Sequence, residues 1–320
     1  MEISAIYIST VVYSSLITVL SIGFTLTYLT AKIPNFAHGT YAGIGIYITF
    51  SLTRLMGLSP YVSIPIAFLF GGALSMLIFI LVIGTLQKIG GGAIVLTIST
   101  LAIQIFMTAA IGIYAFWVLL TFHTYTQPFI LRDNDIQISG LPGVFPFALI
   151  FCIATVIVLH FLLTKTNMGI AMRATAEDPS LASVLGINIY RVQLFSWFLT
   201  GGLACLAGSL LPLWFSSSPI TGSGMITSIM AGSLLGGLDN IYGAIFGGFV
   251  VGTSEQLLTY MLVGLFGNYI GEYRPLIPMI ILIIVLIFEP RGLNGVYERW
   301  QVRKISKARV VEKSNAQEGA

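Results

Sequence analysis

The stretch Tyr61–Leu86, YVSIPIAFLFGGALSMLIFILVIGTL, decides the class of fold, because none of its 26 residues carries a charged side chain. A helix needs about 20 apolar residues to cross the hydrocarbon core of a membrane. Backbone groups in lipid must be hydrogen-bonded within the protein, so a single run of this length is a helix. The whole chain is 56% hydrophobic and 8% charged, far from the roughly one-quarter charged residues of soluble domains. The composition therefore predicts a polytopic membrane protein.

Similar apolar runs lie on both sides of this stretch. The other predicted membrane segments are Ala5–Ala31, Phe36–Thr53, Ala93–Tyr114, Gly143–Thr164, Val192–Trp214, Thr221–Gly237, Tyr242–Leu265 and Arg274–Phe288. We therefore expect an all-α transmembrane helical bundle of about nine segments within residues 1–288. A basic tail at 289–320 follows it. Glu2 and the lack of a basic start indicate that the first run is a retained segment and not a signal peptide.

Basic residues are distributed unevenly between the two sides of such a bundle. One side would hold Lys32, Lys88, Lys165, Arg173, Arg191, Arg291, Arg299, Arg303, Lys304, Lys307, Arg309 and Lys313, and the other only Arg54, Arg132 and Arg274. The positive-inside rule makes the crowded side cytoplasmic. The expected location is the cell membrane, with the N-terminus outside and the C-terminus inside. The cations of the tail either contact lipid headgroups or only set this orientation, and they form no nucleic-acid-binding face.

Two of the predicted segments, Phe36–Thr53 and Thr221–Gly237, are short and rich in glycine. Each is the second element of a block of four segments, and the two blocks start on opposite sides of the membrane. This arrangement predicts an inverted repeat, whose short helices tend to line a central pathway near the membrane midplane. It remains open whether either short segment crosses fully or re-enters.

The most polar internal region is Lys165–Arg191, with two acidic and three basic residues in 27. Asp178 and Pro179 have the pattern of an N-cap and a first helical residue, and Gly186 supplies a left-handed stop. The helix between them carries an apolar stripe, which either docks on a soluble partner or rests on lipid headgroups. The residues assigned to docking are Arg173, Glu177, Asp178, Leu181, Val184, Leu185 and Gly186.

Four polar residues are candidates for a solute pathway. Glu255 lies near the centre of its segment, where a carboxylate must face protein or water; it either lines a pathway or bonds to a neighbouring helix. Gln104 meets either a solute or a backbone carbonyl. Asn35 is a plausible N-cap for the first short helix, and His38 is either a titrating group or a fixed hydrogen-bonding residue.

Signatures of catalysis are absent from the sequence. Gly90–Gly92 is not followed by the Gly-Lys-Ser/Thr of a phosphate-binding loop, and no nucleophile or metal constellation is present. Cys152 and Cys205 fall inside apolar runs, as buried structural thiols do. We expect no enzymatic activity, no catalytic residue, no metal and no cofactor in this chain.

Several segments together resemble one known family. Ile33–Gly39 (IPNFAHG) with Ala42–Phe50 (AGIGIYITF), Gly169–Arg191 (GIAMRATAEDPSLASVLGINIYR), Leu235–Gly248 (LGGLDNIYGAIFGG) and Glu289–Gly295 (EPRGLNG) are similar, in this order, to motifs of branched-chain amino-acid ABC transporter permeases of the H type. Asp239, Asn240 and Glu289 depart from the usual residues of the family. Because permeases of this architecture take various small solutes, these departures affect the expected solute more than the expected fold.

The resemblance implies an ATP-driven importer for branched-chain or related small amino acids. In that family two permease chains, commonly an H-type and an M-type, dock two cytoplasmic ATP-binding subunits, which hydrolyse the ATP. They receive solute from an extracytoplasmic binding protein. The loop matching Gly169–Arg191 contacts the ATPases in that family. The alternatives are a secondary transporter with Glu255 or His38 as the ion-coupling group, which the scarcity of intramembrane charges disfavours, and a structural subunit without a pathway.

Overall fold

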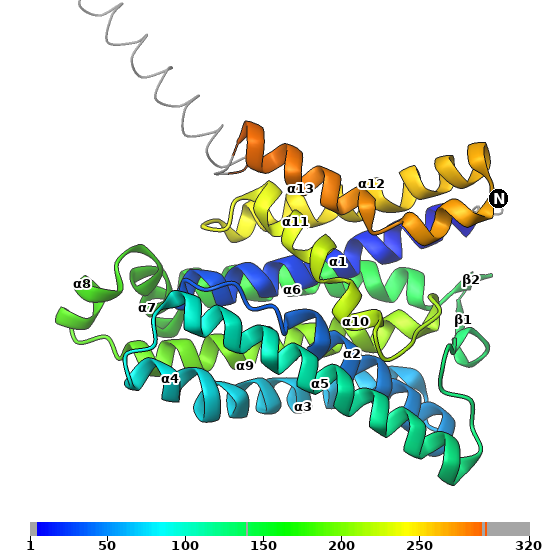
Figure 1. The fold of residues 1–320 in the computed structure, drawn as a ribbon, viewed down its shortest axis with the longest axis horizontal. Coiled ribbons are helices and arrows are strands. Elements are labelled where there is room, and N and C mark those ends of the chain that lie inside the picture. The colour runs from blue at the N-terminus through cyan, green and yellow to red at the C-terminus, as the bar shows by residue number, and fades with distance from the viewer. Residues whose placement is uncertain (1–4, 139, 290–291, 293–320) are drawn as a thin grey trace, which may run out of the picture.

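A computed structural model describes residues 5–138, 140–289 and 292 of the 320 (Figure 1). Helices dominate this part of the chain, which confirms the all-α prediction. Its strands form one two-stranded antiparallel hairpin, β1 (Gln137–Ile138) with β2 (Leu141–Pro142), in which Gln137 pairs with Pro142. The basic tail lies outside the described residues except for Glu289 and Gly292, so its predicted membrane contact stays a prediction.

Six helical segments of the described residues are long and apolar enough to cross a membrane. They are α1 (Ala5–Ala31), α5 (Ala93–Phe122), α6 (Val144–Lys165), α9 (Ile189–Leu210) with a 3-10 turn (Leu211–Leu213), α12 (Ile241–Phe266), and Pro60–Lys88, which joins a 3-10 turn (Pro60–Val62), α3 (Ser63–Ile78), a π-helical turn (Phe79–Ile83) and α4 (Gly84–Lys88). These match six of the nine predicted segments.

The other three predicted segments form shorter helices. They are α2 (His38–Phe50) with a π-helical turn (Ser51–Leu55), α10 (Thr221–Gly224) with α11 (Ile226–Gly236), and α13 (Leu276–Phe288). A helix rises about 1.5 Å per residue, so 13 residues cover about 20 Å, less than the roughly 30 Å of a hydrocarbon core. The structure therefore confirms six membrane-length segments and leaves the count of nine unconfirmed.

The long helices run between two ends of the molecule (Figure 1). One end, here called the hairpin end, holds the start of α1 and the β1–β2 hairpin. The other, the α8 end, holds α7 (Asn167–Glu177) and α8 (Pro179–Val184), which project beyond the bundle. A 3-10 turn (Arg132–Asn134) lies in the loop at the hairpin end, and another (Asn268–Tyr273) leads into α13.

The core is built around α1 and α9, whose residues are largely buried. These two helices pack on each other, α12 packs along α1, and α3 packs along α9. Glycine makes the closest approaches possible. A Cβ at Gly45 of α2 would collide with the backbone of Cys205 in α9, and one at Gly201 would collide with Ser75 and Gly71 of α3. Such small-residue contacts let membrane helices associate without a hydrophobic driving force between them.

Each of the two short glycine-rich segments is helical and is preceded by several residues without regular secondary structure. Residues 32–37 run from the α8 end without regular structure and α2 starts inside the bundle, whereas residues 214–220 come from the hairpin end and lead into α10 (Figure 1). The beginnings of α2 and α10 touch, with Gly39 and Gly43 against Gly222. The N-termini of two short helices therefore meet in the interior.

Three sequence-based details are corrected or extended by the structure. Helix α5 continues to Phe122, so the loop predicted from Ala115 begins only at His123, whose left-handed φ of 52° ends the helix. Asn35 is not an N-cap: that position belongs to Ala37, because the chain already turns at Asn35, whose carbonyl accepts from His38 N. Arg274, which the sequence analysis counted only as a basic residue on the outer side, also forms an ion pair with Glu255.

Candidate transport pathway and docking surface

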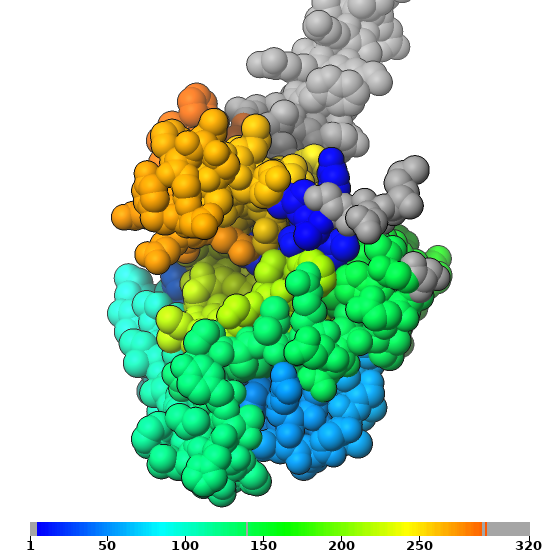
Figure 2. All heavy atoms as spheres, turned by 90° about the vertical axis from the view of Figure 1, so that its right-hand side faces the viewer, coloured from blue at the N-terminus to red at the C-terminus, as the bar shows by residue number. Residues whose placement is uncertain are grey.

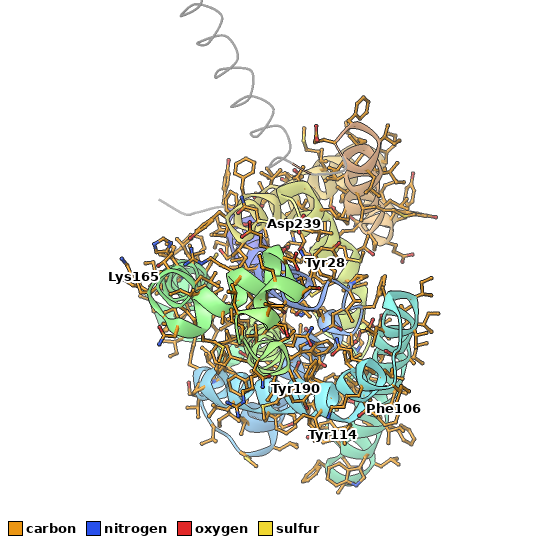
Figure 3. The ribbon with its side chains drawn as sticks, turned by 90° about the vertical axis from the view of Figure 1, so that its left-hand side faces the viewer. Tyr28, Phe106, Tyr114, Lys165, Tyr190 and Asp239 are labelled. Carbon is orange, nitrogen blue, oxygen red and sulfur yellow. The ribbon has the colours of Figure 1, made fainter. Side chains whose placement is uncertain are left out.

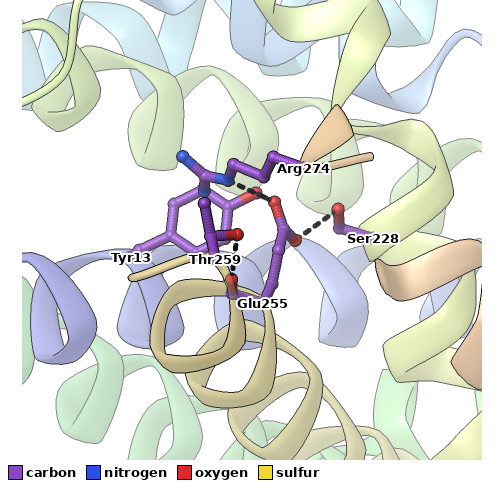
Figure 4. A network of polar contacts seen from close by, with 5 residues as sticks. All are labelled: Tyr13, Ser228, Glu255, Thr259 and Arg274. Atoms are coloured by element: carbon purple, nitrogen blue, oxygen red, sulfur yellow. Dashed lines mark hydrogen bonds and ion pairs between the residues drawn. The ribbon is translucent and has the colours of Figure 1, made fainter. Parts of the chain in front are cut away.

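Glu255, on α12, is 3% exposed and holds the centre of a buried polar network (Figure 4). Its Oε1 accepts from the hydroxyl of Tyr13 at 2.8 Å and from Nε of Arg274 at 2.7 Å. Its Oε2 accepts from the hydroxyl of Ser228 at 2.7 Å. The three donors come from α1, from the residues before α13 and from α11, so one carboxylate ties three segments to α12.

The guanidinium of Arg274, whose side chain is 27% exposed, neutralises this buried carboxylate. Its Cζ also lies 4.1 Å from the centroid of the Tyr13 ring and 6.0 Å from that of Phe215, within cation–π range. Burying a carboxylate costs several kcal/mol, which an ion pair with good geometry and additional hydrogen bonds offsets. Glu255 is therefore enclosed by protein and does not face lipid, while its role in transport stays a prediction.

A cavity of about 160 Å³ opens beside this network. Tyr13, Ser228, Glu255 and Arg274 form its polar wall. Its other lining residues are Leu211, Phe215, Ser216, Thr221, Gly224, Met225 and Pro275. The polar side chains thus converge on one space between α1, α10, α11 and α12.

His38 and Asn35 lie elsewhere, near the start of α2. His38 is fully buried; its Nε2 lies 3.0 Å from the carbonyl oxygen of Leu20, and its ring is edge-on to Phe24. This is the geometry of a fixed hydrogen-bonding residue. Asn35 is 1% exposed, and its side-chain amide has no hydrogen-bond partner among the described residues.

Gln104 lies in a third place, a groove of about 570 Å³ between α5 and the residues around α10. Its polar lining is formed by Gln104, Thr108, Gln127, Ser218 and Ser223. Figure 2 views the hairpin end, where the yellow-green residues before α11 lie between the green α5–α6 region and the orange segment around α13. Because Ser223 of α10 lines this groove and Thr221 and Gly224 line the cavity at Glu255, α10 separates the two spaces.

The local structure predicted for the polar loop is confirmed at the α8 end. Asp178 caps α8, its Oδ1 accepting from Ser180 N at 2.8 Å and from Leu181 N at 3.0 Å, with Pro179 as first residue. Gly186 ends the turn with φ +86°. The apolar stripe is exposed: Leu181 to 59%, Val184 to 83% and Leu185 to 72%. Arg173 and Glu177 lie on α7, a second helix that the sequence did not predict.

A groove of about 510 Å³ runs beside α7. Its walls come from the ends of α1 and α6, from α7 and from the start of α12. Lys32 Nζ lies 3.3 Å from Asp239 Oδ1 across it, an exposed ion pair. Figure 3 views this end of the molecule and shows Tyr28 near Asp239. Lys165 lies across the α7–α8 region from these two residues, at the left of the picture. Arg173 and Glu177 line the groove, whereas the apolar stripe of α8 lies beyond it.

The structure thus does not gather the four pathway candidates in one place. The structure adds Tyr13, Ser228 and Arg274 to the candidate site at Glu255, and the sequence analysis identified none of the three as a site residue. One signal was available for Arg274, because a charge at the edge of a very apolar segment is a natural partner for a mid-membrane carboxylate. The described residues contain no cluster of three or more His, Cys, Asp or Glu side chains able to hold a metal.

Comparisons with known proteins agree with this architecture. A family model described as "Branched-chain amino acid transport system / permease component" matches residues 6–286. A probable branched-chain amino acid transport permease protein LivH of Methanocaldococcus jannaschii is 39% identical over 89% of this chain and 90% of its own. The high-affinity permease BraD of Pseudomonas aeruginosa is 27% identical over 89% and 92%.

One further permease and one solved structure also match the chain. LivH of Escherichia coli K12 is 27% identical over 89% of this chain and 92% of its own. The solved structure of PsaBC from Streptococcus pneumoniae covers 88% of this chain and 91% of its own, with a TM-score of 0.49 and 13% identity. The family match spans nearly all of the described residues and agrees with the motifs in the sequence. The chain therefore belongs to the permease-component family of branched-chain amino acid transport systems, in its H-type branch.

Proposed function

We propose that this chain is the membrane-spanning permease subunit of an ATP-driven importer for branched-chain or related small amino acids. The observation that carries the proposal is the 39% identity to the LivH permease over 89% of the chain. An extracytoplasmic binding protein delivers the solute, and cytoplasmic ATP-binding subunits supply the energy. This chain itself needs no cofactor.

The distribution of charge supports the proposed orientation. Of the described basic residues, Lys32, Lys88, Lys165, Arg173 and Arg191 lie toward the α8 end, whereas Arg54, Arg132 and Arg274 lie toward the hairpin end. The positive-inside rule then makes the α8 end cytoplasmic. In this orientation the N-terminus is outside, the C-terminus is inside, and α7 and α8 face the cytoplasm.

The same orientation makes α8 the docking element for an ATP-binding subunit. Its three apolar side chains are exposed on a capped helix that projects from the bundle. An exposed apolar stripe rimmed by polar residues is typical of an interaction site, because burial in a groove on a partner removes its apolar surface from water. Arg173 and Glu177, on the adjacent groove wall, are placed to form polar contacts at the edge of that interface.

The packing of the helices supports an inverted repeat. In such a repeat, α1 corresponds to α9, α2 to α10–α11 and α3 to α12. Helix α3 packs along α9 in one half, and its counterpart α12 packs along α1 in the other. The contact of α2 with α9 likewise corresponds to that of α11 with α1. If these two short segments and α13 also cross the membrane, the bundle has nine segments, six of them built from membrane-length helices.

The solute pathway in this proposal has two parts. The groove with Gln104 faces outward on α5, and a polar strip on a membrane helix has to face water or another protein chain. A second permease, which we expect to be of the M type, supplies its opposite wall. The cavity at Glu255 and the junction of α2 with α10 lie behind this groove. The ion-coupled carrier is not favoured, because Glu255 is held in an ion pair and the relatives are transport permease components.

Affinity purification tests the assembly. A tagged version of this chain, extracted in mild detergent, should bring down ATP-binding subunits and a second permease in equal amounts. Purification of the chain alone, with leucine uptake driven by a proton or sodium gradient in proteoliposomes, would instead establish the carrier.

A further inference from the structure

The cavity beside Glu255 and Arg274 has hydrogen-bonding capacity that the protein does not use. Nη2 of Arg274 is buried and has no acceptor among the described residues. A carboxylate offers about four acceptor positions, and Glu255 uses three of them. Both side chains line the cavity. An ion pair that served packing alone is expected to be fully satisfied, because each unused polar group in a low-dielectric site costs free energy.

The two charges complement one chemical class of ligand. A positive and a negative group bonded at 2.7 Å form a pair without net charge, which gives no net attraction to a lone ion but offers an opposite charge to each end of a zwitterion. The planar guanidinium suits a carboxylate, and its free nitrogen is the donor available for one. The remaining acceptor position of Glu255 suits an ammonium group, and Ser216 and Thr221 also line the cavity.

The size and the remaining lining agree with a small solute. A volume of about 160 Å³ equals about five water molecules at their share of liquid volume, which suits a small amino acid and excludes a nucleotide or a peptide. Leu211, Phe215 and Met225 provide an apolar wall for an aliphatic side chain.

We propose that this cavity is a solute-binding site in which Arg274 receives the α-carboxylate and Glu255 the α-ammonium group of the transported amino acid. The inference rests on the proposed function for the nature of the solute. Tyr13 and Ser228 are positioning residues, because each bonds to Glu255 and holds its carboxylate toward the cavity.

Equilibrium binding of radiolabelled L-leucine to the assembled importer in nanodiscs, without binding protein or nucleotide, tests the site. Leucinamide lacks the carboxylate and 4-methylpentanoate lacks the ammonium group. Each should compete roughly tenfold or more weakly than unlabelled leucine, because each leaves one charge of the pair without its ligand. The double variant Glu255→Gln/Arg274→Gln keeps polar side chains of similar size without burying a charge. It should assemble and lose leucine binding.

The exposed pair Lys32→Gln/Asp239→Asn serves as the matched control and should bind leucine as the wild type does. Three outcomes would overturn the proposal: no saturable leucine binding by the wild-type importer, competition by either analogue as strong as that by unlabelled leucine, or unchanged binding by the double variant. ATP-driven uptake by the same wild-type preparation separates the two inferences. Uptake without binding at this cavity rejects only the site, whereas absence of uptake rejects the proposed function.

Discussion

Replacing Leu185 by Asp tests the proposed docking surface, and the structure sets the size of the effect. Leu185 is 72% exposed, so docking removes at most about three quarters of its side chain from water. Complete burial of a leucine is worth about 1.5–3 kcal/mol, which gives about 1–2 kcal/mol for this contact. That loss weakens binding of the ATP-binding subunit about 5- to 30-fold. Desolvation of the introduced carboxylate adds a further cost to the weakened contact.

The assay is titration of purified ATP-binding subunit against the permease in nanodiscs, followed by ATP-dependent uptake. Folding of the permease should be unaffected, because the side chain is mostly in water before docking. Met56, which is 67% exposed near the hairpin end, is the matched control, and Met56→Asp should leave the affinity unchanged. Wild-type affinity and uptake in Leu185→Asp would show that α8 is not the docking element.

Three further changes test the packing, the helix cap and the ion pair. Gly45→Ala should lower the stability of the protein by about 1–3 kcal/mol through overpacking, because its Cβ meets the backbone of α9. This loss should appear as a lower melting temperature. Gly264→Ala is the control and should leave the melting temperature unchanged, because open space surrounds that position. Asp178→Ala removes two capping bonds, so about 1 kcal/mol of local stability should disappear; unchanged amide hydrogen exchange in α8 would contradict this. Glu255→Gln should destabilise by about 3–5 kcal/mol by leaving Arg274 unpaired. The melting temperature should recover when Arg274→Gln is added, and additive losses would refute the coupling.

Local sequence signals predicted the local structure well. The cap at Asp178, the first residue Pro179 and the stop at Gly186 depend on neighbours within a few residues, and all three are in the structure. The long helices were also predictable, because apolar runs of about 20 residues have one stable structure in lipid. Helix α7 was missed, because its few apolar residues are interrupted by Arg173 and by a glycine.

The arrangement of the site was not predictable, because it depends on contacts between distant segments. Tyr13 and Glu255 are 242 residues apart in the sequence, and only the packing of α1 on α12 brings them together. The pattern that marked Glu255 as costly did not identify its partner. Asn35 was misassigned because residues 36 and 37 form a turn, so that α2 begins only at His38. Hydropathy does not distinguish a membrane-length helix from a shorter one, so the sequence did not show that three of the nine predicted segments form shorter helices.

Uptake by reconstituted importer tests the central claim most directly. Proteoliposomes containing this chain, its partner permease and the ATP-binding subunits, with the binding protein outside and ATP inside, should accumulate radiolabelled leucine. Accumulation should stop when ATP is replaced by a non-hydrolysable analogue. Leucine uptake by this chain alone under an ion gradient, without the other subunits and without ATP, would contradict the account.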